Sequence, residues 1–202
     1  MADAELIDFA LARRRIVGNS PRMSSRFVSI ALVAAFFVGS SGAAYAAEED
    51  EFDPLKVDVV DAIECRLDPG TYTGFAFALD SEEAGYKARG WKKQESGNSF
   101  LAQYQLPEPV TVAGQATRTI VFSSSAIMAL LDGDPQSFAA AEKINNAVPG
   151  GAKFLGERLV HSESETAEGM KITSTVKRVL SNVTSHPGKT LLGCSYTLEI
   201  ED

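Results

Sequence analysis

Residues 191–200 read LLGCSYTLEI, and apolar side chains alternate with polar or small ones along this stretch. An alternation of period two predicts a β-strand that buries one face and exposes the other. Cys194 belongs to the apolar face and is therefore expected in the core. The positions that share this face are Leu192, Cys194, Tyr196, Leu198 and Ile200.

Turn-forming residues divide the chain before this stretch into further strands. The sequence His186-Pro187-Gly188 predicts a hairpin that joins a strand over 170–184 to the last strand over 190–200. The same reasoning applies upstream, where turn residues again separate runs rich in β-branched and aromatic side chains. The other predicted strands cover 71–79, 99–113, 117–130 and 153–165.

Two Asp-Pro pairs, Asp53-Pro54 and Asp134-Pro135, predict where helices begin, because Asp is a good N-cap and Pro fits the first helical position. An apolar stripe at helical spacing follows each pair, and Pro69-Gly70 and Pro149-Gly150-Gly151 are expected to end the helices. Alternate apolar positions over 57–67 are also compatible with a strand. The shared Asp-Pro start favours a helix there.

The order of predicted elements is the same in both halves of the chain, a helix followed by three strands. This order predicts a tandem duplication, with one repeat over 54–133 and a second over 134–202. The expected fold class is α+β, a predominantly antiparallel sheet with two helices on one face. Residues 47–202 are expected to form one compact domain that begins with an acidic leader over 47–53.

An export signal with an upstream extension is predicted over 1–46. Residues 27–38 form a short apolar run, two arginines precede it, and the A-x-A sequence that ends at Ala46 supplies a peptidase site. Cleavage after Ala46 predicts a periplasmic or secreted protein. An uncleaved anchor is the alternative, although the run is short for a membrane span. The start codon is that of Met1 or of Met23.

Acidic side chains dominate the part of the chain that follows the predicted signal. The whole chain carries 19 basic and 27 acidic side chains. Five basic and three acidic ones precede Ala47, which leaves 14 against 24 and a net charge of −10. Such a surface repels phosphate backbones and anionic lipid, so we expect no nucleic acid partner and, after signal cleavage, no membrane partner.

The two cysteines, Cys65 and Cys194, are predicted to form a disulfide, because export places an even number of cysteines in an oxidising compartment. A redox-active pair is the alternative. The C-x-x-C spacing that lowers a thiol pKa is missing, which favours the structural disulfide.

Common catalytic motifs are missing from the sequence: it contains no G-x-S-x-G, H-E-x-x-H, P-loop or G-x-G-x-x-G. No catalytic residue and no cofactor is therefore predicted. The nearest approach to a metal site is His161, Glu163 and Glu165, which share one face of a predicted strand and offer imidazole and carboxylate ligands. An exposed polar strand end is the simpler interpretation, so no metal is predicted.

The region over 81–98 is an insertion, because the second repeat has only a short turn at the corresponding place. We expect this inserted loop to face a partner, since loops commonly present binding groups. Trp91 would anchor the partner, and the basic side chains would select an acidic protein surface or an acidic small ligand. The alternative is that Trp91 is a plug in its own domain. The expected contact residues are Lys87, Arg89, Trp91, Lys92 and Lys93.

These patterns favour an exported binding, adaptor or inhibitor-like domain of unknown partner. One alternative is a hydrolase or lyase whose site is built from scattered carboxylates. Another is a membrane-tethered structural protein, should the signal be retained. A concave pocket with inward carboxylates of perturbed pKa would favour the enzyme.

Overall fold

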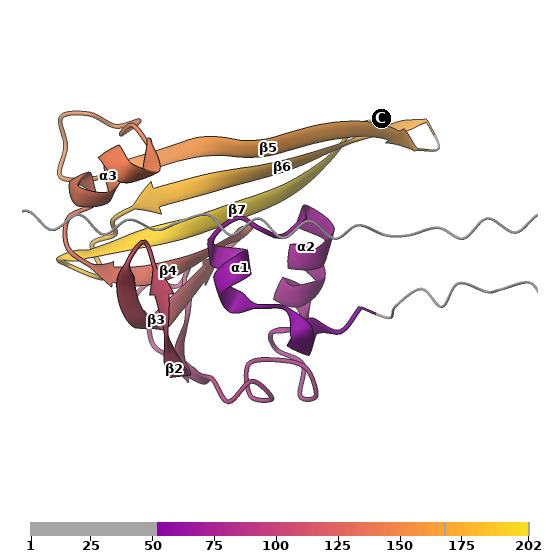
Figure 1. Cartoon of the computed structure of the whole chain (residues 1–202), viewed down its shortest axis with the longest axis horizontal. Coiled ribbons are helices and arrows are strands. Elements are labelled where there is room, and N and C mark those ends of the chain that lie inside the picture. Colours follow the sequence, from indigo (N-terminus) through magenta and orange to yellow (C-terminus); the bar gives the residue numbers. More distant parts are fainter. Residues whose placement is uncertain (1–51, 168, 202) are drawn as a thin grey trace, which may run out of the picture. The chain divides into compact units, whose positions relative to one another are not determined.

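Figure 1 shows the computed structural model of the protein, which describes residues 52–167 and 169–201. The predicted export signal, its cleavage site after Ala46 and nearly all of the acidic leader lie outside the described residues. Within the described ranges, no helix is long and apolar enough to cross a membrane.

A mixed sheet-rich architecture is confirmed. The described residues form seven strands in the order β1-β2-β3-β4-β7-β6-β5, and every pair of neighbours is antiparallel. Two meanders, β2-β3-β4 and β5-β6-β7, therefore meet where β4 pairs with β7. The strands are β1 (Lys92–Gln94), β2 (Ala102–Val112), β3 (Gln115–Ser123), β4 (Ala126–Asp132), β5 (Leu155–Ala167), β6 (Met170–Ser181) and β7 (Lys189–Glu201).

Aspartates initiate the helical segments of the described chain. Asp53 accepts a backbone N–H before the 3-10 helix η1 (Pro54–Lys56), and Asp58 does so before α1 (Val59–Ile63). Asp134 caps the segment that leads into α3 (Gln136–Glu142), where its carboxylate accepts the N–H of Gln136. Each carboxylate satisfies backbone donors that the first turn leaves unpaired. The helix predicted from Pro54 to Leu67 is thus two short segments.

The strand predicted over 71–79 is wrong, because these residues belong to α2 (Pro69–Ala78). Asp68 accepts a hydrogen bond from the N–H of Thr71 at 2.9 Å and another from its hydroxyl at 2.6 Å. Pro69 occupies the first helical position, so Asp68-Pro69 starts a helix at the place where Pro69-Gly70 was expected to end one. An Asp-Pro pair therefore precedes this helix too, as it does at Asp53-Pro54 and Asp134-Pro135.

The single strand predicted over 117–130 is also wrong, because the chain folds back within it. Residues Ser124 and Ser125 form the turn between β3 and β4, and Ser124 adopts a left-handed backbone with φ of 47°. Ser123 pairs with Ala126 on either side of this turn. The run of serines was expected in mid-strand, yet their small polar side chains suit a tight turn.

The main core lies between the helices and one face of the sheet. Three α-helices contribute to it, where the sequence predicted two, and Ile63, Phe75 and Phe138 are their buried representatives. Cys194 of β7 is fully buried in the same core, as the alternation of the last strand predicted. The opposite face carries a smaller buried cluster of Val121, Met128 and Leu191.

Strands β5, β6 and β7 continue past the end of β4 and form a three-stranded ribbon at one side of the sheet (Figure 1). The pairing of β7 with β4 ends at Ser195, which lies opposite Ala126. Its pairing with β6 continues as far as Glu201, opposite Lys171. We call residues 161–167, 170–176 and 196–201 the distal ribbon.

Candidate functional site

The inserted loop is folded onto the domain, and its tryptophan is part of the core. Trp91 is 7% exposed. Its ring packs edge-on against Phe75 at a centroid distance of 6.4 Å, and lies 6.1 Å from the ring of Tyr104. The burial of Trp91 matches the alternative of a plug in its own domain, and its role as a partner anchor stays a prediction.

Arg89, the second expected contact residue, holds the start of the domain in place. Its guanidinium lies over the rings of Phe75 and Trp91, at 4.8 and 5.1 Å from their centroids. It also donates hydrogen bonds to the carbonyl oxygens of Pro54 and Val57. These contacts assign Arg89 to the packing of η1, so its charge serves the fold.

The three lysines of the inserted loop remain on the surface. Lys87, Lys92 and Lys93 are exposed. The ammonium group of Lys93 lies 3.8 Å from the carboxylate of Asp80, which accounts for part of the local positive charge. The structure thus does not bring the five expected contact residues together as one surface.

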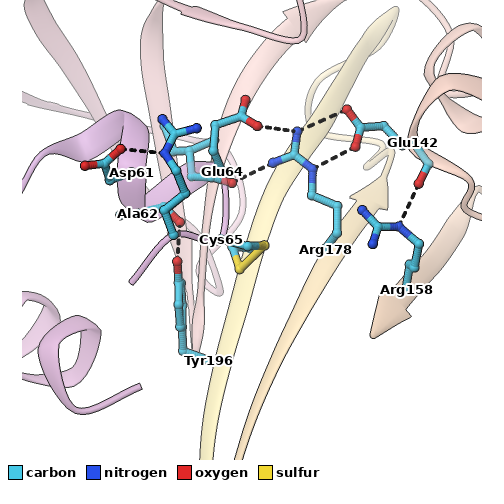
Figure 2. A network of polar contacts seen from close by, with 11 residues as sticks. Asp61, Ala62, Glu64, Cys65, Glu142, Arg158, Arg178 and Tyr196 are labelled. Atoms are coloured by element: carbon cyan, nitrogen blue, oxygen red, sulfur yellow. Dashed lines mark hydrogen bonds and ion pairs between the residues drawn. A yellow bond between two sulfur atoms is a disulfide. The ribbon is translucent and has the colours of Figure 1, made fainter. Parts of the chain in front are cut away.

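A buried polar network joins β6 to α1 and α3, and Figure 2 shows it. Arg178 is 3% exposed, and its guanidinium makes a two-pronged contact with Glu142 at 3.0 and 3.1 Å. It also donates to the carbonyl oxygen of Ile63 at 2.6 Å and lies 3.4 Å from the carboxylate of Glu64. Arg158 donates to the carbonyl oxygen of Glu142 at 2.9 Å.

The predicted disulfide lies beside this network. Cys65 and Cys194 are bonded, with a Cα–Cα distance of 5.2 Å, and the phenol of Tyr196 donates to the carbonyl oxygen of Ala62 at 2.7 Å. We call Glu64, Glu142, Arg178, Tyr196 and the disulfide the α1 clamp. Its single guanidinium is shared by two carboxylates, and its contacts fasten α1 to the sheet, so its chemistry is structural.

The residues considered for a metal site lie on the distal ribbon. His161 Nε2 is 3.6 Å from a carboxylate oxygen of Glu163, and both side chains are exposed. Among residues 52–167 and 169–201, no group of three His, Cys, Asp or Glu side chains has a geometry that could hold a metal ion. His161 and Glu163 line a groove of about 290 Å³ together with Asp68 and the first residues of α2.

His186, expected as a simple turn residue, links two parts of the molecule. Its Nε2 lies 2.7 Å from Gln103 Oε1, and its Nδ1 lies 2.9 Å from Ser185 Oγ. Gln103 in turn donates to Gln94 at 3.0 Å. Burial lowers the pKa of His186, which favours the neutral ring. The ring also borders a cavity of about 500 Å³ that Pro135 and Lys153 line from the opposite side.

An apolar groove that sequence reasoning missed lies between α2 and β7. It has a volume of about 250 Å³, and we call it the α2–β7 groove; its lining residues are Tyr72, Thr73, Ala76, Phe77, Ser124, Ser125 and Tyr196. Phe77 is 84% exposed. Leu198 and Ile200 follow Tyr196 on the same face of β7 and are 46% and 63% exposed. The alternation out to Ile200 was visible in the sequence, but α2 was not.

Two phenols form the floor of this groove. The rings of Tyr72 and Tyr196 are stacked with a centroid distance of 4.3 Å, and burial raises the pKa of both. The hydroxyl of Tyr196 is satisfied by Ala62, whereas the buried hydroxyl of Tyr72 has no hydrogen-bond partner in the described part of the chain. The groove is therefore lined by two buried, stacked aromatic rings.

Comparison of the chain with known protein families, with curated proteins and with solved structures gave no match.

Proposed function

We propose that this protein is an exported binding module whose partner is another protein, and that the α2–β7 groove and the adjoining residues of β7 are its contact surface. The observation that carries the proposal is the exposure of Phe77, which lines the α2–β7 groove, and of Leu198 and Ile200, which follow the groove residue Tyr196 on the same face of β7. Apolar side chains grouped in this way mark surfaces that are covered in a complex. Aromatic residues are also among the side chains that contribute most to binding at protein interfaces.

Export fits the covalent structure of the domain. A disulfide that joins α1 to β7 persists in an oxidising compartment. Cleavage after Ala46 would release the domain into the periplasm or the medium, where an acidic surface keeps it away from anionic lipid. A retained signal would instead tether the same binding surface to a membrane.

The carboxylates of the domain support a binding module over a hydrolase or lyase. Asp68 lines the groove beside His161 and Glu163, where a carboxylate site could form. Burial alone would raise the pKa of Asp68, but its hydrogen bonds from Thr71 outweigh burial, and its pKa is lowered. An ionised carboxylate whose oxygens cap a helix is poorly suited to donate a proton.

An acidic small ligand is a second candidate partner, and one observation favours it. Lys92 of the inserted loop and Arg118 of β3 line the same pocket of about 210 Å³. Arg118 also contacts Glu108 at 3.4 Å, so part of its charge is already neutralised. Within residues 52–167 and 169–201, the ammonium group of Lys92 has no ion-pair partner, and it is the charge that this pocket offers an acidic ligand.

The tandem duplication belongs to the same proposal. Each half of the described chain contains a helix followed by a three-stranded meander, and the two meanders meet at the β4–β7 pair. The distal ribbon exists because β7 is longer than β4, its counterpart in the first half. Divergence between the two halves would thus have created the exposed end of β7.

Affinity capture from the exported protein fraction tests the function. The bait is the wild-type domain, and a triple variant, Phe77→Ser, Leu198→Ser and Ile200→Ser, removes the proposed surface. A matched variant, Leu155→Ser and Leu159→Ser, changes two leucines of β5 that are each 57% exposed. We expect a protein that the wild type and the β5 variant retain and the triple variant loses. Equal recovery with all three baits would reject the proposal.

A further inference from the structure

The exposed end of β7 has an unpaired backbone edge. The N–H of Tyr196 donates to the carbonyl oxygen of Ser125 at 2.9 Å, which fixes the side of β7 to which this residue's backbone groups point. Backbone groups two residues apart in a strand point to the same side. Leu198 and Ile200 therefore direct their N–H and C=O groups away from β6. Within the residues that the structure describes, residues 197–201 of β7 pair with β6 alone.

We propose that this edge of β7 is a strand-addition site, at which an extended segment of the protein partner pairs with residues 197–201 in the place where β4 would continue. The inference rests on the proposed binding function and specifies its mechanism. Five residues at a rise of about 3.4 Å each offer an edge of about 17 Å. Main-chain hydrogen bonds supply affinity in this mode of recognition, and side-chain pockets supply selectivity.

The chemistry of the two faces defines the partner segment. On the helix side, the added strand would lie against Leu198, Ile200 and Phe77, so its alternate residues are apolar. Glu199 and Glu201 lie on the opposite face. Among the residues that the structure describes, only Glu201 of these two forms an ion pair, with Lys171 at 3.0 Å. The intervening residues of the segment are therefore basic, which also suits a domain of net charge −10.

The other two edges of the sheet are protected against such pairing. The edge strand β5 carries a bulge between Leu159 and His161 and several charged side chains. The edge strand β1 is three residues long and contains two lysines. Bulges, short length and lysines are the usual means of blocking an exposed edge. The pairing of β6 with β7 has no register shift, and the open end of β7 presents isoleucine and leucine.

The α2–β7 groove receives one end of the added strand. Its wall includes Ser124 and Ser125, at the turn where β4 begins, and Tyr196, which lies one residue before the free edge. An apolar side chain of the segment that lies beside Ser125 would enter the groove over the stacked rings of Tyr72 and Tyr196. This contact fixes where along β7 the segment begins.

The first test uses a blocked octapeptide of alternating lysine and valine, with a block peptide of four lysines and four valines as the control of equal composition. Fluorescence anisotropy measures both affinities for the wild-type domain. We expect the alternating peptide to bind at least about fivefold more tightly, a difference that one or two added hydrogen bonds can supply. Methylation of the peptide nitrogens that would pair with β7 should abolish this preference. Equal affinity of the two peptides overturns strand addition.

The second test follows the backbone itself. In the wild-type domain, hydrogen exchange should be fast at the amides of Leu198 and Ile200 and slow at those of Thr197 and Glu199, which face β6. The alternating peptide should slow exchange at Leu198 and Ile200. Leu198→Pro removes the open-side N–H without removing one that β6 uses, and should weaken peptide binding, whereas Leu198→Val should not.

Unchanged exchange at Leu198 and Ile200 with the peptide bound overturns strand addition. Such a result, together with capture that depends on Phe77, Leu198 and Ile200, would mean that the module binds through side chains alone. Capture that ignores those three residues would instead reject the binding function, whatever the peptide does. The two failures are therefore separable.

Discussion

The two ends of β7 carry the same alternating pattern, but the apolar face is buried at one end and exposed at the other. Around Cys194 the apolar face is sealed by α1, by the disulfide and by the ion pairs of Arg178. At Leu198 and Ile200 the same face is partly exposed, and β7 has passed the end of its pairing with β4. Alternation therefore indicates which side chains share a face, and the length of neighbouring elements decides whether that face is covered.

The largest expected loss of stability is at the buried end of β7, near Cys194. Arg178→Ala would leave Glu142 and Glu64 without their shared cation in a half-buried setting, and we expect a loss of about 3 to 5 kcal/mol in the free energy of unfolding. Urea denaturation of the variant measures it. Arg158→Ala is the matched control, because Arg158 donates only to the carbonyl oxygen of Glu142 and should cost about 1 kcal/mol. Similar losses in the two variants would contradict the clamp.

Trp91 tests whether the inserted loop belongs to the closed or the open part of the molecule. Removal of the indole from between Phe75 and Tyr104 should leave a cavity, and Trp91→Ala should lose about 3 to 5 kcal/mol of stability. A thermal melt measures the loss. The control is Phe100→Ala at an exposed aromatic residue of the same region, which should melt close to the wild type. A Trp91→Ala protein as stable as the wild type would support the prediction that the inserted loop contacts a partner.

The disulfide should contribute about 2 to 5 kcal/mol, since it closes a loop of 129 residues. Cys65→Ala with Cys194→Ala removes it while keeping both positions apolar. Denaturation of this double variant should show a loss in that range, and addition of reductant should then have no further effect. A double variant as stable as the wild type would show that the ion pairs and Tyr196 suffice to hold α1.

His186 should make a smaller contribution than the disulfide, and it should appear in the pH dependence of the free energy of unfolding. Burial lowers the pKa of His186 in the folded domain, whereas the unfolded chain titrates near its ordinary pKa of about 6.5. The unfolded state thus binds more protons in this range, so stability falls as pH drops below about 6.5 and stops falling below the folded pKa. His186→Gln should flatten this part of the profile.

The sequence predicted those parts of the fold whose causes are local. Alternation located β7, proline and glycine located its hairpin, and cysteine parity located the disulfide. The helix α2 was missed because Pro69-Gly70 was expected to end a helix, whereas Asp68 accepts hydrogen bonds from the backbone N–H and the hydroxyl of Thr71 and so starts one. At this place the N-cap Asp68 outweighs the strand propensity of the residues that follow it, as side-chain caps often do in short segments.

The candidate site could not be predicted because non-local facts create it. The α2–β7 groove requires α2 to lie beside β7, and the open edge requires β4 to begin opposite Ser195. Neither fact is visible in any one segment. The position of Arg89 could not be predicted either, because its guanidinium donates to the carbonyl oxygens of Pro54 and Val57, which are distant in the sequence.

The smallest expected effect on stability is at the open end of β7, and it is the sharpest test of the comparison. Leu198→Ser with Ile200→Ser changes two apolar residues of the strand that holds Cys194, yet these side chains are already 46% and 63% exposed. We expect the free energy of unfolding to change by no more than about 0.5 kcal/mol for each residue. If a partner buries the same side chains, their replacement should instead weaken the affinity for that partner.

The two measurements on this variant should therefore disagree. Its urea midpoint should match that of the wild type, while its affinity for the alternating lysine and valine peptide should fall. If the midpoint falls steeply instead, Leu198 and Ile200 are part of the domain's own core, and the open end of β7 is closed in solution. A stable variant with weaker peptide binding would show that β7 stabilises the fold at Cys194 and contacts a partner at Ile200. The reason is geometric, since β7 extends beyond β4 and its last residues are left without a strand on that side.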